Sequence, residues 1–408
     1  MNAKFKPLGL AAAVAAASAG YAGVVNAQSA SVAAETELGD LAIVPYYTVQ
    51  EGYATGVNII NTGNNTHVVK VRFRRATDSM DALDFNVVLS PYDMYTGFIT
   101  TDGDDIKFVS NDNSCTAPAY PEGGFVMPSI YRTDAETGYI EIISMGQPTT
   151  ETAPIAVAAK HGADGVPANC AAVRDNFFAD ATATTRGVFA ADQTHQLDAN
   201  GVAQPTFYTA ADNDLKVSYF IKSDETGVEF GDNAVHVENF IEVPSMTNQQ
   251  KGVFEGDLLG FDHPDLNGAS PLASGRVSRF GDLRDILGAE TLINDWSQNS
   301  NDTIGFTVDT DWVVTFPGQY VMLNLPQYLG FLAVPESITC TGSSTAISCD
   351  NRDIPMRAQF SVYDREEQGI TVEEGDLVVS PQPPGEVTID VLDKEVNVIE
   401  WGSESVLN

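Results

Sequence analysis

Three short segments carry acidic side chains at the spacing that a hard cation favours. They contain Asp102, Asp104 and Asp105, then Asp212 and Asp214, then Asp309 and Asp311. Carboxylate oxygens separated by one or two residues suit Ca²⁺, which takes several oxygen ligands. None of the segments has the full calcium-loop pattern with its terminal Glu, and turns favour Asp for reasons of their own. These aspartates are therefore calcium candidates, and no other cofactor is indicated.

Cysteine is the second residue type with a chemistry of its own. The chain contains Cys115, Cys170, Cys340 and Cys349. An even number in an exported chain favours disulfides. A bridge between Cys340 and Cys349 would close a short polar loop and leave Cys115 to pair with Cys170, although sequence alone does not fix this connectivity. Zinc is the competing interpretation, but there is no C-x-x-C pair and no histidine at ligand spacing from a cysteine.

One strand-like segment concentrates positive charge in a chain that has little of it. Lys70, Arg72, Arg74 and Arg75 lie within six residues, alternating in part with Val69, Val71 and Phe73. One interpretation is a strand face that is paired with acids across a sheet. The other is an assembly patch that meets the acidic surface of a neighbouring copy.

Signals for catalysis are missing from the sequence. It contains no G-x-S-x-G, no H-E-x-x-H, no phosphate loop and no dinucleotide fingerprint. The histidines are His67, His161, His195, His236 and His263. None has the context of a catalytic triad; His236 is expected on a strand face, and His263, in a loop with two acids, is the better metal-ligand candidate. We therefore predict that the protein is not an enzyme.

A glycosidase is the one enzyme class that the residues leave open. Its chemistry needs two carboxylates at a set separation in space. The chain has 56 Asp and Glu residues, which are too many for a pair to be singled out. An envelope carbohydrate-binding module or a polysaccharide-active enzyme is therefore the alternative function.

The elements that position these residues are mostly strands. Short segments rich in Val, Ile, Phe and Tyr alternate in polarity and end at Gly, Pro, Asn or Asp, which is typical of antiparallel sandwiches. The expected strands are 56–61, 69–74, 84–89, 138–143, 215–221, 234–243, 311–316, 320–325, 357–363 and 395–401. A helix is expected at 282–296, and a second helical stretch is a candidate around 168–179. The predicted fold class is all-β, mainly antiparallel, with one or two β-sandwich units, one short helix and long loops.

The same pattern suggests a division of the chain. The segments are a signal peptide (1–27), a flexible mature N-terminus (28–37), a first β-sandwich unit (38–145), an irregular Ala/Thr/Gly-rich segment (146–204) and a second β unit (205–408). The alternative is one extended sandwich with the irregular segment as an insertion.

The first residues and the overall charge indicate where the protein works. Lys4 and Lys6 precede an Ala-rich apolar stretch that ends in the small-x-small pattern at Ala27, as in a secretory signal. Without these two lysines the net charge changes from −35 to −37. Such a charge opposes binding to nucleic acid. It suits a secreted protein at the bacterial cell surface, or a layer held together by divalent ions, and no membrane-spanning segment is expected after signal removal.

A set of short motifs, in their order, resembles a family of proteins. The motifs are Ile43-Val44-Pro45-Tyr46-Tyr47-Thr48, Asn58-Ile59-Ile60-Asn61-Thr62, Leu89-Ser90-Pro91-Tyr92-Asp93, Asn113-Ser114-Cys115, Asp311-Trp312-Val313-Val314-Thr315-Phe316-Pro317 and Tyr363-Asp364-Arg365-Glu366-Glu367. They resemble a poorly characterised family of exported proteobacterial β-rich cell-surface proteins of surface-layer-like type. The resemblance implies export and a β fold, and it brings no catalytic residues.

Together these observations predict a secreted structural protein that forms or decorates an extracellular layer or filament, with calcium as a candidate aid to self-assembly. Its expected partners are copies of itself or other envelope components.

Overall fold

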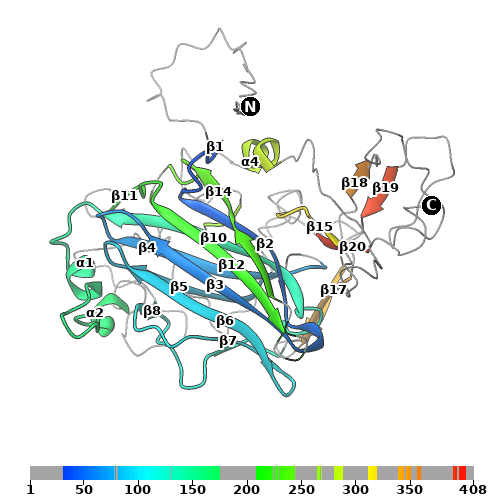
Figure 1. Cartoon of the computed structure of the whole chain (residues 1–408), viewed down its shortest axis with the longest axis horizontal. Helices are drawn as coiled ribbons and strands as arrows, with labels where there is room; N and C mark the ends of the chain where they lie inside the picture. Colours follow the sequence, from blue (N-terminus) through cyan, green and yellow to red (C-terminus); the bar gives the residue numbers. More distant parts are fainter. Residues whose placement is uncertain are drawn as a thin grey trace, which may run out of the picture.

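The computed structural model is a two-layered β structure (Figure 1). It describes residues 31–77, 79, 81–129, 131–174, 208–223, 225, 227, 229–242, 244, 264–266, 268, 280–287, 311–318, 339–343, 346–350, 356–359, 389–392 and 395–400. Every strand pair in it is antiparallel, and this confirms the predicted all-β class.

The larger sheet has eight strands, in the order β1-β14-β2-β10-β4-β5-β8, with β11 paired to β10. Its strands are β1 (Val32–Ala33), β2 (Leu41–Thr48), β4 (His67–Arg75), β5 (Asp81–Leu89), β8 (Cys115–Ala117), β10 (Thr137–Pro148), β11 (Tyr208–Thr209) and β14 (Val235–Glu238). Strand β4 therefore lies inside the sheet, between β10 and β5.

The smaller sheet has six strands, in the order β13-β12-β3-β6-β7-β9. They are β3 (Tyr53–Asn61), β6 (Met94–Asp102), β7 (Asp105–Val109), β9 (Phe125–Val126), β12 (Leu215–Ser223) and β13 (Glu229–Asn233). Strands β12, β3 and β6 are its central strands, and they run side by side across the sandwich in Figure 1.

The main core fills the space between these two sheets. Val71 and Phe73 of β4 and Phe85 of β5 meet Tyr95 of β6 and Phe108 of β7. The alternation predicted for β4 is confirmed, because Val69, Val71 and Phe73 are core residues while Lys70, Arg72 and Arg74 point to the other side of the sheet. Hydrophobic burial of these faces is what holds the two layers together.

Smaller elements surround the sandwich. They are the 3₁₀ turn η1 (Gln50–Gly52), the helices α1 (Pro154–Ala159), α2 (Cys170–Arg174) and α4 (Phe280–Leu287), and the strand pairs β15 (Asp311–Thr315) with β20 (Val396–Glu400), β16 (Thr339–Ser343) with β17 (Ala346–Asp350), and β18 (Met356–Gln359) with β19 (Ile389–Leu392). Among the described residues, no helix is long and apolar enough to cross a membrane.

Most predicted elements are present with shifted ends. Helix α4 covers the start of the segment expected at 282–296, and α2 covers part of 168–179; the remainder of each lies outside the described residues. The strand expected at 320–325 and the signal peptide also lie outside them. The strand expected at 234–243 is shorter, because β14 ends at Glu238.

The predicted division of the chain needs correction. Strand β12 pairs with β3, and β14 pairs with β2, so residues 208–238 complete the same sandwich as the first unit. A boundary at 205 would cut through both sheets, and one extended sandwich with an insertion is the arrangement found. The segment 28–37, expected to be flexible, contains β1, which pairs with β14.

Candidate functional site

One face of the six-stranded sheet points away from the core. Val57 and Ile59 of β3 face the core, so Gly56 and Asn58 face outward. The strand register extends these positions into two rows: Phe220, Gly56 and Phe98 form one row, and Ser218, Asn58 and Thr96 form the other. We call these six residues the outer face.

The aromatic row is shaped by its central glycine. The rings of Phe220 and Phe98 lie 5.4 Å apart at 84° to one another, on the two strands that flank β3. A Cβ atom at Gly56 would lie 2.4 Å from Cζ of Phe220, so this arrangement requires glycine on the central strand. Phe98 remains 42% exposed, and Phe220 is half-buried. A pair of phenyl rings is thus held at the surface by its backbone surroundings.

The neighbouring row supplies amide and hydroxyl groups. Asn58 Nδ2 donates a hydrogen bond of 3.3 Å to Ser218 Oγ, across the β3–β12 pair. Asn58, Ser218 and Thr96 are all half-buried. The row therefore has partly fixed hydrogen-bonding groups next to exposed aromatic rings, an arrangement that is common in small-molecule and cofactor sites.

The outer face contains no ionisable side chain, in a chain whose net charge is −35. Three lysines lie next to it on the same side of the sheet: Lys107 Nζ lies 2.5 Å from Asp102 Oδ2, Lys216 pairs with Glu37, and the exposed Lys222 is opposite Glu229 in the β12–β13 register. The surface potential over the two rows is therefore set by neutral groups and by charges at their margin.

A depression adjoins the aromatic row at the β12–β13 hairpin. It has a volume of about 500 Å³ and is lined by Ser218, Tyr219, Phe220, Glu229, Phe230, Gly231, Asp232 and Asn233. Ser218 and Phe220 belong to both the outer face and this depression, so the two are continuous. Glu229 and Asp232 add carboxylate acceptors at one end.

The basic strand is buried, whereas an assembly patch would have to be exposed at the surface. Lys70, Arg72, Arg74 and Arg75 are all buried. Lys70 Nζ lies 3.8 Å from Asp84 Oδ2, and Arg74 Nη1 lies 2.6 Å from Asp81 Oδ1. This is the cross-strand pairing with acids, and it leaves no exposed patch for a neighbouring copy to meet.

Residues distant in sequence cover the charged side of β4. The Pro264 carbonyl lies 3.4 Å from Arg72 Nη1, Gly318 N donates to the Tyr139 hydroxyl at 3.1 Å, and Glu395 N donates to the Ala76 carbonyl at 2.8 Å. These contacts lie on the side of the eight-stranded sheet that faces away from the main core. Residues as far along the chain as Glu395, just before β20, therefore help to bury the charged side of β4.

The calcium candidates do not converge on one point. Asp102 is paired with Lys107, which lowers the pKa of this carboxyl, and Asp105 Oδ1 lies 2.7 Å from Arg132 Nη2. The Asp104 carbonyl also accepts from Arg132. Within the described ranges, no group of three or more His, Cys, Asp or Glu side chains could hold a metal ion.

The second group of calcium candidates is Asp212 and Asp214, and the third is Asp309 and Asp311. Asp212 accepts from Asn65 Nδ2 at 2.8 Å and from Gln147 Nε2 at 3.2 Å. Burial, and then the charge of Asp212, raise the pKa of Asp214. Asp311 begins β15, and Asp309 lies outside the described residues.

Two of the histidines are enclosed within the sandwich. Burial lowers the pKa of His67 to about 4, and His67 Nδ1 lies 3.0 Å from Ser144 Oγ. Burial also lowers the pKa of His236 to about 4, and its Nε2 accepts from the Val217 amide at 2.8 Å. His236 is on a strand, as expected. His195 and His263 lie outside the described residues.

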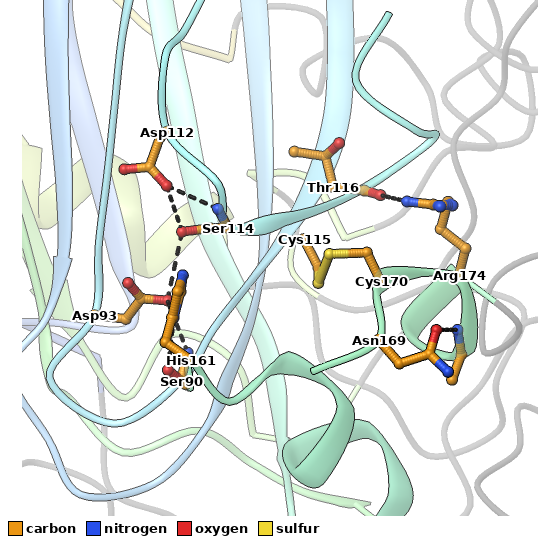
Figure 2. The surroundings of a disulfide bond; sticks show 11 residues. Ser90, Asp93, Asp112, Ser114, Cys115, Thr116, His161, Asn169, Cys170 and Arg174 are labelled. Carbon is orange, nitrogen blue, oxygen red and sulfur yellow. Dashed lines mark hydrogen bonds and ion pairs between the residues drawn. A yellow bond between two sulfur atoms is a disulfide. The ribbon is translucent and has the colours of Figure 1, made fainter. Parts of the chain in front are cut away.

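His161 lies beside a serine and an aspartate without forming a triad. Its Nδ1 is 3.4 Å from Ser90 Oγ and 3.5 Å from Asp93 Oδ2 (Figure 2). A catalytic triad needs the hydroxyl and the carboxylate on different ring nitrogens. Both groups meet the same nitrogen here, and burial raises the pKa of Asp93. The contact fastens the end of α1 to the β5–β6 turn.

The disulfide fastens the same region from the other side. Cys115 of β8 is bonded to Cys170 of α2, with the Cα atoms 5.0 Å apart (Figure 2). This confirms one of the two predicted bridges. In the β16–β17 pair the register places Cys340 opposite Cys349, and the second bridge remains a prediction.

No protein-family model, curated protein or solved structure matches this chain.

The outer face was missed by sequence reasoning, although a signal for it is present. In Leu215–Ile221 the residues that alternate with the core are Lys216, Ser218 and Phe220. A phenylalanine on the polar side of a predicted strand indicates an exposed ring. Its neighbour Phe98 could not be found in this way, because the register that brings β6 beside β3 is not contained in either segment alone.

Proposed function

We propose that this chain is an exported protein of the bacterial cell surface that decorates an extracellular layer by binding to another envelope component. The outer face is its contact surface. The observation that carries the proposal is the pair of rings at the surface, the exposed Phe98 and the half-buried Phe220, of which Phe220 packs over Gly56. Exposed aromatic groups beside fixed polar groups are a common composition of recognition surfaces.

Two further observations support this location and mode of action. The N-terminal residues have the pattern of a secretory signal, and the Cys115–Cys170 bridge suits an oxidising compartment. The motifs that resemble exported surface-layer-like proteins point to the same place. The His161 contacts described above do not have the geometry of a nucleophile and its base.

Co-sedimentation with isolated envelopes of the source bacterium tests this proposal. The chain without residues 1–27 is mixed with envelopes and centrifuged, alongside the double variant Phe98→Ala/Phe220→Ala. Tyr92→Ala is the matched control, because Tyr92 is 73% exposed but lies in the β5–β6 turn. We expect the unmodified chain and the control to pellet with the envelopes and the double variant to stay in solution. Equal behaviour of all three would contradict the proposal.

Ordered self-assembly into a layer is a second candidate. Copies with a net charge of −35 repel one another, and this repulsion is weakest where neutral surfaces meet, as at the outer face. Divalent cations would screen the remaining acids. Negative-stain microscopy with and without a chelator tests this candidate: arrays that disperse on chelation support it, and a uniform monomer under both conditions removes it.

A further inference from the structure

We infer that the outer face binds a neutral polysaccharide, with a sugar ring placed against Phe98 and Phe220 and its hydroxyls bonded to the Ser218–Asn58–Thr96 row. This inference rests on the proposed function and names the chemical class of the envelope component. Three observations support it: an aromatic row beside a polar row, the lack of ionisable side chains in both rows, and the adjoining depression.

The two rows match the two chemical sides of a sugar. A pyranose ring has a face of C–H groups, which packs well on an aromatic ring, and a rim of hydroxyls. Phe98 and Phe220 supply the apolar contact, and Asn58 and Ser218 supply donors and acceptors one row away. The two rows are two residues apart on each strand, which is about 7 Å, so both fall within the span of one or two sugar units.

A purely apolar partner fits this face less well. Such a partner would cover the Asn58 amide and the Ser218 and Thr96 hydroxyls without offering them hydrogen bonds. Covering polar groups so that they lose their water without gaining a new partner is unfavourable. A polyol covers the same groups and replaces the water contacts. The mixture of ring and amide therefore favours a sugar over an apolar peptide.

The charge of the protein decides between neutral and acidic sugars. A polyuronate or a phosphate-rich polymer would approach a chain of net charge −35. Of the three lysines beside the outer face, Lys107 and Lys216 are paired with acids, and Lys222 lies opposite Glu229 in the strand register. Repulsion therefore acts against anionic polymers, while a neutral chain is unaffected.

The depression beside Phe220 extends the site beyond a single ring. Its volume of about 500 Å³ is within the range of ligand sites in proteins, and Asn233 at its wall offers another amide. Glu229 and Asp232 can accept hydrogen bonds from sugar hydroxyls there. A chain that crosses β6, β3 and β12 would reach this depression at the β13 end of the sheet.

Affinity electrophoresis tests the inference with defined probes. The chain without residues 1–27 runs in native gels that contain a neutral β-glucan, a neutral α-glucan, a neutral mannan or a polyuronate. We expect retardation by at least one neutral polymer and none by the polyuronate. Phe98→Ala and Phe220→Ala should each weaken retardation about tenfold or more, and Tyr92→Ala should leave it unchanged.

Each other result overturns the inference. The inference is wrong if no neutral polymer changes the mobility, or if only the polyuronate retards the chain. It is also wrong if the ring variants are retarded as strongly as the unmodified chain. Circular dichroism and unfolding curves of the variants establish that they are folded, as expected for half-exposed side chains.

A second experiment distinguishes failure of this inference from failure of the proposed function. Envelopes are treated with periodate, which cleaves vicinal diols of sugars, or with protease. Loss of co-sedimentation after periodate alone supports the sugar ligand. Loss after protease alone overturns the sugar ligand but leaves an envelope-binding protein. Envelopes that never bind the chain contradict the proposed function itself.

Discussion

Arg74 holds Glu141 by two parallel hydrogen bonds inside the protein. Arg74 Nε donates to Oε1 at 3.0 Å and Arg74 Nη2 to Oε2 at 3.2 Å, and the two side chains are 3% and 0% exposed. Arg72 Nη1 lies 3.4 Å from the same carboxylate. Glu141 is therefore a shared anion for two buried guanidinium groups on β4.

Replacing Glu141 by Gln should destabilise the protein strongly. The change keeps the shape but removes the negative charge between two buried cations, and breaking a buried pair in this way costs about 3–5 kcal/mol. Denaturant unfolding of the variant and the unmodified chain measures the difference. Asp102→Asn is the control, because the ion pair of Asp102 with Lys107 lies at the surface, and it should change stability far less than Glu141→Gln does. A Glu141→Gln variant as stable as the control would contradict the role given to this network.

Removal of the Cys115–Cys170 bridge should loosen the α1–α2 segment. The bridge closes a separation of 55 residues, for which the chain-entropy relation gives about 4 kcal/mol. We expect Cys115→Ser/Cys170→Ser to show faster amide exchange in 154–174 than in β3 or β4. Uniform exchange throughout would contradict this local effect. Peptide mapping without reductant should also recover the predicted Cys340–Cys349 pair.

Acidification should weaken the fold through His67. The folded protein lowers the pKa of this ring from 6.5 to about 4, so protons bind the unfolded chain first as the pH falls. The stability contributed by neutral His67 is complete above about pH 6.5 and is lost toward pH 4, amounting to about 3 kcal/mol for a shift of this size. Unfolding of His67→Gln at pH 7 and pH 4.5 should show a smaller loss than the unmodified chain. An identical loss in both would exclude His67 as the cause.

A negative charge placed in the polar row should impair sugar binding. Asn58→Asp keeps the size of the side chain but puts a carboxylate beside Ser218, where desolvation under a ligand is unfavourable. We expect several-fold weaker retardation in the neutral polysaccharide gel. Thr101→Asp is the matched control, because Thr101 is exposed on β6 but alternates to the opposite side of the strand. If both variants lose the same affinity, total charge rather than the outer face is responsible.

The strands were predictable from local patterns, but the segments that pack against them were not. The alternation in 69–74 identified β4 and the side on which its cations lie. That this side is buried depends on Pro264, Gly318 and Glu395, which are roughly 190–320 residues further along the chain. No pattern within the strand contains that information.

The strand pairing across the predicted boundary at 205 and the partners of the aspartates could not be predicted, for a related reason. Residues 208–238 read as the start of a new unit, yet β12 and β14 insert beside β3 and β2. Clusters of aspartate were visible in the sequence, but the pairing of Asp102 with Lys107 and of Asp105 with Arg132 is a property of the fold. The Cys115–Cys170 bridge could be predicted, because the short polar loop between Cys340 and Cys349 favours a bridge there and leaves Cys115 to Cys170.

Hydroxyl-radical footprinting tests the central claim most directly, because it reads the exposed side chains of the outer face themselves. The chain is oxidised with and without solubilised neutral envelope polysaccharide, and modification is quantified at Phe98, Phe220 and Tyr92. Our account predicts that the polysaccharide protects Phe98 and Phe220 and leaves Tyr92 unchanged. Unaltered oxidation of both phenylalanines at saturating polysaccharide, or protection confined to Tyr92, would contradict it.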